Sequence, residues 1–92
     1  MVDVDICVRV VLRDKEVGAF KKTVRIPESL LNRGCELYHD WRSVIYWDLD
    51  DVRLDMTTGR VCVVIKDDCL DDETDAADSL AKWPQIGFVA VD

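Results

Sequence analysis

The recurrence of apolar side chains at every second position at the start of the chain constrains its fold most strongly. Apolar residues occupy every even position from Val2 to Leu12, and Asp3, Asp5 and Arg9 stand between them. Successive side chains of a strand point to opposite faces of a sheet, so this period is typical of a strand with one buried face. The pattern therefore predicts a strand over residues 2–12.

A second segment, residues 18–26, has apolar side chains at the same period and predicts the partner strand of a hairpin. The register that keeps the apolar side chains on one face leaves residues 13–17 as a five-residue loop. The same register places Asp5 opposite Arg25 on the outer face.

Pro27 favours the start of a helix, because its fixed φ suits the first helical position. Apolar residues then recur at helical spacing, which predicts a helix over residues 28–41. Gly34 lies within the apolar stripe, where we expect close approach of the helix to the sheet. A short strand is predicted at residues 44–47, and residues 47–51 are predicted to form the loop after it.

The clearest local pattern is a β-hairpin in the segment DVRLDMTTGRVCVVIK, residues 51–66. A two-residue turn at Thr58 and Gly59 would pair Leu54 with Val63. All six apolar side chains of the two strands would then share one face.

The acidic segment that follows predicts a second helix over residues 71–82, because acidic residues in a first turn complement the helix dipole. Its inner face is expected to carry Leu70, Ala76, Ala77, Leu80 and Ala81. We expect the helix to end before Pro84, since the residue before a proline avoids the helical region. Residues 86–91 are apolar on both faces and predict a final strand inside the sheet.

The order of these elements, ββαβββαβ, indicates an α+β fold in which two helices pack on one face of an antiparallel or mixed sheet. The apolar share of 49% is ordinary for a globular protein. A chain of 92 residues supports one hydrophobic core, so residues 1–92 are expected to form a single α+β domain.

The sequence carries no apolar run near the roughly 20 residues that a membrane-spanning helix needs. Its N-terminal segment contains acidic residues and is interpreted as a strand instead of a signal peptide. We therefore expect a cytoplasmic protein without membrane contact, whose four cysteines are reduced thiols.

Charge is distributed unevenly along the chain. Residues 1–47 carry eight Lys/Arg and seven Asp/Glu, whereas residues 48–92 carry four and twelve, which together give the net charge of −7. A one-sign field of this size steers basic ligands toward the protein and argues against direct binding to nucleic acid or anionic lipid. The basic residues around the first hairpin are interpreted as protection of a sheet edge or as a modest anion-binding face.

The acidic excess is concentrated in residues 67–78, where seven of twelve residues are acidic and none is basic. These seven are Asp67, Asp68, Asp71, Asp72, Glu73, Asp75 and Asp78. On the predicted helix Asp71, Asp75 and Asp78 form one exposed row, and Asp68 extends it if the helix begins early. Seven charges over about 18 Å of helix match the linear charge density of a nucleic-acid backbone.

This acidic run has three interpretations. It is a solvated face that keeps the protein soluble, or a surface that docks on a basic partner, or a cation site. The run lacks the glycine and the position-12 glutamate of an EF-hand loop, which argues against specific calcium binding.

Trp47, followed by Asp48, Asp50 and Asp51, combines an aromatic side chain with three carboxylates. Tyr46 and Trp47 are neighbours on a strand, so only one of them points inward, and the other is interpreted as rim packing or as an interface anchor. A carboxylate-pair or two-metal enzyme would also use aspartates of this kind. No accompanying base, lysine or glycine-rich loop is present in the sequence, so we do not expect an enzyme.

Cys35 and His39 are one helical turn apart, a spacing that fits zinc, and Cys62 and Cys69 would complete four ligands in number. The absence of a C-x₂-C pair from the sequence favours ordinary thiols and a surface histidine. A Cys–His nucleophile pair lacks an activating third residue. We therefore expect no cofactor or metal and assign no catalytic residue.

With Asp48, Asp50, Asp51 and the run from Asp67 to Asp78, the chain resembles the small acidic proteins of mobile genetic elements that block nucleic-acid-handling machines. These include phage anti-CRISPR proteins and nucleic-acid mimics, and immunity proteins that neutralise basic nuclease toxins are similar in physical logic. The resemblance implies a stoichiometric inhibitor that occupies a Lys/Arg-lined nucleic-acid site without chemistry of its own.

We therefore predict a non-enzymatic protein-binding inhibitor whose acidic second half docks on a basic, nucleic-acid-binding protein or complex. Charge would accelerate association, and an exposed aromatic side chain would slow dissociation. The expected partner-binding residues are Trp47, Asp48, Asp50, Asp51, Asp67, Asp68, Asp71, Asp72, Glu73, Asp75 and Asp78. The alternatives are a structural or assembly subunit, including a homo-oligomer joined through an open sheet edge such as the last strand, and an immunity protein.

Overall fold

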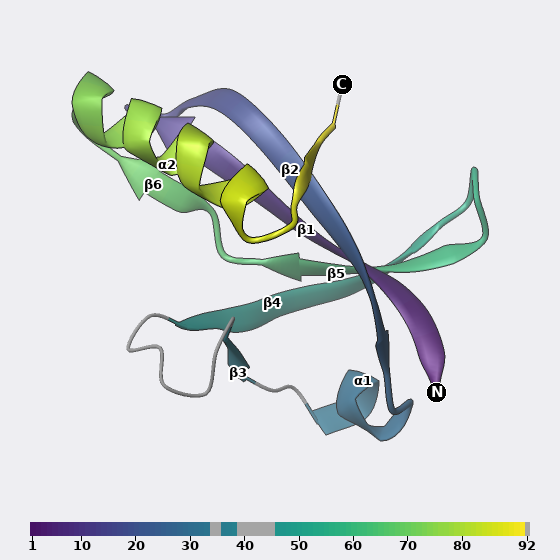
Figure 1. Cartoon of the computed structure of the whole chain (residues 1–92). Coiled ribbons are helices and arrows are strands. Elements are labelled where there is room, and N and C mark those ends of the chain that lie inside the picture. The colour runs from purple at the N-terminus through teal and green to yellow at the C-terminus, as the bar shows by residue number, and fades with distance from the viewer. Residues whose placement is uncertain (34–35, 39–45, 92) are drawn as a thin grey trace. The chain divides into compact units, whose positions relative to one another are not determined.

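The computed structural model describes residues 1–33, 36–38 and 46–91, with side chains for residues 1–31 and 52–91. The described chain is a mixed α+β protein built mainly from strands, with two helices, as the sequence predicted (Figure 1). It divides into two compact units. Unit 1 comprises Met1–Ile6 and Thr23–Lys66, and unit 2 comprises Cys7–Lys22 and Asp67–Asp92.

The elements follow the order ββαββββαβ. They are β1 (Val2–Leu12), β2 (Lys15–Ile26), α1 (Ser29–Arg33), β3 (Glu36–Tyr38), β4 (Tyr46–Asp55), β5 (Arg60–Ile65), β6 (Asp68–Leu70), α2 (Glu73–Gln85) and β7 (Val89–Ala90). Main-chain hydrogen bonds join the strands in the order β3-β4-β5-β1-β2-β7, and β6 pairs with β1 in parallel. The predicted order ββαβββαβ is wrong, because β3 and β6 were not foreseen and two predicted strands are one strand, β4.

The first hairpin forms as predicted but with a tighter turn. Only Arg13 and Asp14 separate β1 from β2, so the predicted loop over residues 13–17 is wrong. Both turn residues have positive φ, 50° and 68°. This backbone conformation lets a two-residue turn follow the twist of the two strands that it joins.

The side-chain partners across this hairpin differ from those of the predicted register. Arg25 donates to Asp3 and Thr23 donates to Asp5, whereas the prediction placed Arg25 opposite Asp5. The apolar pattern fixes the face of each side chain but not its partner across the hairpin.

The helix predicted over residues 28–41 is confirmed only in its first part, and its predicted extent is wrong. The helix α1 ends at Arg33, and the amides of Leu30 and Leu31 donate to the carbonyls of Pro27 and Glu28 at its start. The later part of the predicted helix contains β3, which is antiparallel to β4. Gly34, Trp41 and residues 44–45 lie outside the described residues.

The strand β4 includes the segment that the sequence assigned to a loop, residues 47–51. It pairs with β3 on one side, with Leu37 opposite Trp47, and with β5 on the other. The register with β5 shifts between Leu49 and Asp51. Pairing on both sides explains why a segment rich in aspartate is extended here, since tertiary context overrides a weak local propensity.

The hairpin of β4 and β5 is confirmed, but its predicted register is wrong by two residues. Leu54 pairs with Val61, and Asp55 pairs with Arg60, which leaves a four-residue turn. Asp55 holds this turn, because its carbonyl accepts from the amide of Gly59 at 2.7 Å and its carboxylate accepts from the amide of Thr57 at 2.8 Å. Gly59 has a φ of 74°, which suits glycine.

The apolar side chains of this hairpin are buried on one strand only. Val63 and Ile65 of β5 are buried, together with Val4 of β1 in the same unit. Val52 and Leu54 of β4 lie opposite Val63 and Val61 and so share their face, as predicted, but they are 37% and 60% exposed.

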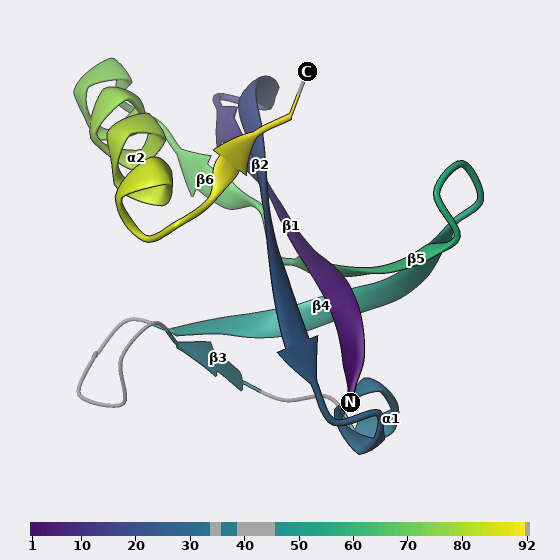
Figure 2. The same ribbon diagram turned by 45° about the vertical axis from the view of Figure 1, so that its right-hand side comes forward.

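In unit 2, α2 runs beside β6 and turns back into β7 (Figures 1 and 2). Its inner face carries Ala76, Ser79, Leu80 and Trp83, at the spacing i, i+3, i+4 and i+7. The buried side chains of the unit outside α2 are Val8, Val10, Phe20 and Phe88. Ala77 and Ala81 are exposed, contrary to the prediction.

Gly18 of β2 allows close approach of α2 to the strand. A Cβ atom at this position would lie 2.6 Å from Cδ2 of Leu80, well inside van der Waals contact. The sequence predicted such an approach at Gly34 of the first predicted helix, which lies outside the described residues.

The helix α2 ends one residue after Pro84, not before it. Pro84 has no N–H, so it donates no helical hydrogen bond to the carbonyl of Leu80. The amide of Ile86 donates to the carbonyl of Trp83, and Gly87, with a φ of 95°, donates to that of Pro84. Within the described residues, no helix combines the length and the hydropathy that crossing a membrane requires.

Candidate protein-binding surface

The acidic run begins with an ion pair between its first residue and β1. The Arg9 guanidinium donates to both carboxylate oxygens of Asp67, with Nε–Oδ1 at 3.0 Å and Nη2–Oδ2 at 2.6 Å. The hydrogen bond from Arg9 to Asp67, and then the charge of that carboxylate, raise the pKa of Arg9. Arg13 makes two further hydrogen bonds to this segment, both at 3.0 Å. The amide of Arg13 donates to the carbonyl of Leu70, and Nε of Arg13 donates to the carbonyl of Asp71.

The second residue of the run, Asp68, connects β6 to α2. Its Oδ2 accepts hydrogen bonds from the Ser79 hydroxyl and from Nε1 of Trp83, the latter at 3.0 Å. Lys82 Nζ lies 3.7 Å from the same oxygen and 4.7 Å from the Trp83 ring centroid. The Trp83 ring also packs edge-to-face on Phe88, with centroids 4.9 Å apart. Asp68 is only 18% exposed and therefore acts as a structural hydrogen-bond acceptor.

Asp72 is the N-cap of α2. Its carboxylate accepts from the amides of Thr74, at 2.6 Å, and Asp75, at 3.4 Å, while its carbonyl accepts from the amide of Ala76. Glu73 and Asp75 lie in the first turn, where their charges interact favourably with the helix dipole. The acidic character of the segment thus explains where the helix begins.

We call Asp67, Asp68 and Asp72 the anchored carboxylates, because each has a contact inside unit 2. The remaining four, the exposed carboxylates, have solvent-exposed side chains: Asp71, Glu73, Asp75 and Asp78. This division of the acidic run into two sets is the main feature of the surface.

The predicted helical row of acidic residues is only partly formed. Asp71 precedes α2 and Asp68 lies in β6, so the expectations that they belong to one helical row are wrong. Of the seven acidic residues, only Glu73, Asp75 and Asp78 are helical. The comparison with the linear charge density of a nucleic-acid backbone, which assumed seven charges on one helix, therefore does not apply.

The other predicted site residues lie in unit 1. Trp47, Asp48, Asp50 and Asp51 belong to β4, with Trp47 opposite Leu37 of β3 and Asp51 opposite Val64 of β5. Their side chains are outside the described set. The two groups of the predicted site thus belong to different compact units.

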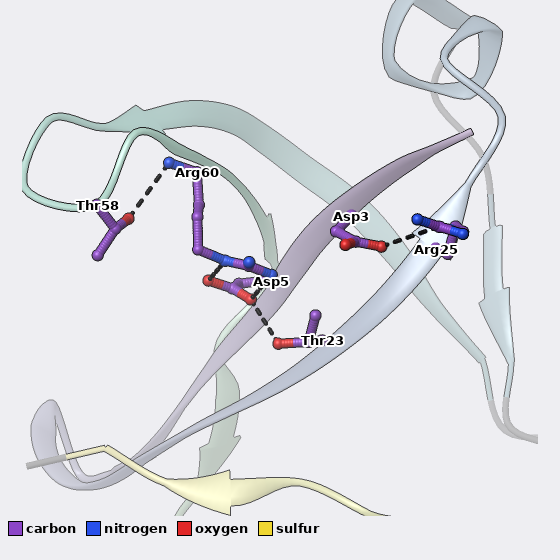
Figure 3. A network of polar contacts seen from close by, with 6 residues as sticks. All are labelled: Asp3, Asp5, Thr23, Arg25, Thr58 and Arg60. Atoms are coloured by element: carbon purple, nitrogen blue, oxygen red, sulfur yellow. Dashed lines mark hydrogen bonds and ion pairs between the residues drawn. The ribbon is translucent and has the colours of Figure 1, made fainter.

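Unit 1 contains a polar network that the sequence did not indicate (Figure 3). Arg60 of β5 donates to both oxygens of Asp5, at 3.1 and 3.0 Å, and Thr23 Oγ1 donates to Asp5 at 2.7 Å. Arg25 donates to Asp3 at 3.2 Å. The hydrogen bond from Arg60 to Asp5, and then the negative charge of Asp5, raise the pKa of Arg60. The signal in the sequence was the placement of Asp3 and Asp5 on the polar face of β1, opposite strands with basic residues.

The basic residues of the first hairpin also have intramolecular partners. Arg9, Arg13 and Arg25 make the contacts described above, and Lys22 Nζ donates to the carbonyl of Ile86 at 3.0 Å. The interpretation of this hairpin as an anion-binding face is therefore weakened, since four of its cations contact acidic side chains or carbonyl groups.

The described cysteines, Cys7, Cys62 and Cys69, are not joined in disulfides. Cys35 and His39, the core of the zinc hypothesis, lie outside the described residues. Among the side chains that the structure describes, no group of three or more His, Cys, Asp or Glu is arranged to hold a metal ion.

Chemically, the surface around α2 offers acceptors for ion pairs and hydrogen bonds on a helix that is fixed by its own N-cap and by Asp68. Such an arrangement favours binding of cationic groups. No family model, curated protein or solved structure matches this chain significantly.

Proposed function

We propose that this protein is a cytoplasmic, non-enzymatic inhibitor that binds a basic, nucleic-acid-binding protein or complex, in the manner of anti-CRISPR and other anti-defence proteins. The observation that carries the proposal is the set of exposed carboxylates at the start of α2. Three of them lie on the first turns of the helix, within about 7.5 Å along its axis.

Preorganisation supports the proposal. The Asp72 cap and the contacts of Asp68 with Ser79 and Trp83 hold α2 in place before any partner binds. Charged groups on a fixed element lose less conformational freedom on association than charged groups on a loop. The net charge of −7 adds long-range attraction for a cationic partner.

In this proposal the anchored carboxylates support the surface, and the exposed carboxylates contact the partner. The segment of β4 with Trp47, Asp48, Asp50 and Asp51 supplies a second contact, in which Trp47 is the aromatic anchor. Replacement of Trp47 by alanine tests this second contact separately, and it should reduce retention of the partner if Trp47 is the aromatic anchor.

The test uses the triple variant Asp71→Asn, Asp75→Asn, Asp78→Asn. Wild-type protein immobilised on a resin is expected to retain a basic nucleic-acid-binding complex from host lysate at low salt. The triple variant is expected to lose most of this retention. At about 1 M salt, where the Debye length is about 3 Å, the wild type should release it as well.

A matched control separates a local surface from net charge. The variant Asp14→Asn, Glu16→Gln, Glu28→Gln removes the same three charges from exposed side chains outside the acidic run. It should retain the partner almost as well as the wild type. Equal retention of the partner by the triple variant Asp71→Asn, Asp75→Asn, Asp78→Asn and by the wild type would contradict the proposal.

A further inference from the structure

The last strand, β7, is at the edge of the sheet. It pairs antiparallel with β2, with Phe20 opposite Ala90 and Lys21 opposite Val89. No described strand lies on its other side. The sequence predicted that this strand lies inside the sheet, so that expectation is wrong. Val89 and Val91 are 64% and 43% exposed.

The main-chain polar groups of β7 show which of them face the open edge. The amide of Val91 donates to the carbonyl of Ala19 at 2.8 Å, so the polar groups of Val91 point toward β2. These groups alternate sides along an antiparallel strand. The N–H and C=O of Ala90 therefore point away from β2 and are available to another strand.

The protection of this edge is limited to the shortness of β7, which has two residues. Edge strands of monomeric proteins commonly carry a lysine, a proline or a bulge that discourages pairing with another chain. β7 and the residue after it read Val89-Ala90-Val91, which are three apolar residues without charge.

We propose that two copies of this chain associate by antiparallel pairing of β7 with β7, around a two-fold axis at Ala90. Ala90 of each copy then donates to and accepts from Ala90 of the other, and Val89 of each copy lies opposite Val91 of the other. The apolar residues match on both sides of the axis, so the edge is self-complementary. This proposal is independent of the proposed function, because it involves none of the exposed carboxylates.

The charges near the edge are compatible with this pairing. Lys21 is opposite Val89 on β2, so the Lys21 side chains of the two copies are separated by three strand spacings, at least about 14 Å. This separation exceeds the Debye length of about 8 Å at physiological salt. Because β7 is short, we expect a weak dimer whose population depends on concentration.

Sedimentation equilibrium of the full chain between about 10 μM and about 1 mM tests the proposal. The wild-type mass should rise toward twice the monomer mass. Ala90→Pro should remain monomeric, because it removes the outward N–H but none of the hydrogen bonds between β7 and β2. Val89→Lys should also remain monomeric, although it lowers the net negative charge and with it the repulsion between copies.

Leu54→Lys is the matched control, since it makes the same change at another exposed apolar residue of a strand, on β4. It should dimerise like the wild type, and circular dichroism should show that all three variants are folded. A wild-type protein that stays monomeric throughout would overturn the proposal. So would dimerisation of Ala90→Pro at the wild-type level, or a loss of dimer in Leu54→Lys alone.

Discussion

The carboxylates at the β6 end of the acidic run differ from those on the outer side of α2 in what they contact. Asp67 and Asp68 interact with Arg9, Ser79, Trp83 and Lys82. Asp75 and Asp78, a few residues later in the same run, are exposed. Identical side chains therefore stabilise the fold at one end of the run and remain accessible to a partner at the other.

This difference shows that a count of acidic residues overstates the charge that the surface offers. Two of the seven charges are compensated by Arg9 and Lys82, and a third caps α2. The binding surface in our proposal is consequently smaller than the acidic run, and its position depends on the residues that hold α2 in place.

The largest effect is expected for Asp68→Ala, which removes the acceptor shared by Ser79 and the Trp83 indole. Buried donors without an acceptor are costly, and we expect the free energy of unfolding to fall by about 2–3 kcal/mol. Urea unfolding monitored by tryptophan fluorescence measures the change. If Asp68→Ala were as stable as the wild type, Asp68 would belong with the exposed carboxylates.

A smaller effect is expected for Asp72→Ala, because the variant loses the hydrogen bonds to the amides of Thr74 and Asp75. Loss of an N-cap side chain costs about 1 kcal/mol. Asp72→Asn should recover most of the loss, since an amide oxygen also caps a helix, and thermal unfolding compares the two. Equal losses in both variants would indicate that the charge of Asp72, and not the cap, matters.

A still smaller effect, and one that depends on pH, is expected for Asp55→Ala in the turn of unit 1. The amide of Thr57 donates to the Asp55 carboxylate and lowers its pKa from the ordinary 3.8. The contribution of Asp55 to stability is therefore complete above pH 3.8 and is lost as the pH falls through the lower, folded-state pKa.

Melting temperatures of the wild type and of Asp55→Ala, measured between about pH 3 and about pH 6, test this expectation. The two curves should converge at the acidic end and separate above it. A difference that does not change with pH would show that the carboxylate charge contributes nothing to the turn.

The apolar pattern of the sequence predicted the strands and their faces, but not the registers of the hairpins. The period of two identified β1, β2 and the β4–β5 hairpin, and it assigned the faces of Val4, Val8 and Val10 correctly. The predicted register of the β4–β5 hairpin was wrong by two residues, and the apolar pattern could not detect the error because a shift of two preserves every face. The turns decide the register. The first turn consists of Arg13 and Asp14, and it contains no glycine that would identify it in the sequence as a two-residue turn.

Helix prediction failed where strand pairing overrode local periodicity. Glu36–Tyr38 fits a helical stripe in the sequence but pairs with β4 in the structure. For α2, the assumption that Pro84 ends the helix hid Trp83, whose spacing from Ala76 and Ser79 does continue the inner face. Of the candidate site, the sequence located the acidic run but could not show which carboxylates the fold itself uses. The partner of Asp67, Arg9, comes from a distant part of the chain.

The most direct test of the division is equilibrium urea unfolding of two variants that each remove two charges from the same run. Asp67→Asn with Asp68→Asn should lower the free energy of unfolding by about 2 kcal/mol or more, because hydrogen bonds to charged acceptors are weakened or lost. Asp75→Asn with Asp78→Asn should stay within about 0.5 kcal/mol of the wild type, as is usual for exposed substitutions. Equal losses in the two variants would contradict the separation of anchored from exposed carboxylates.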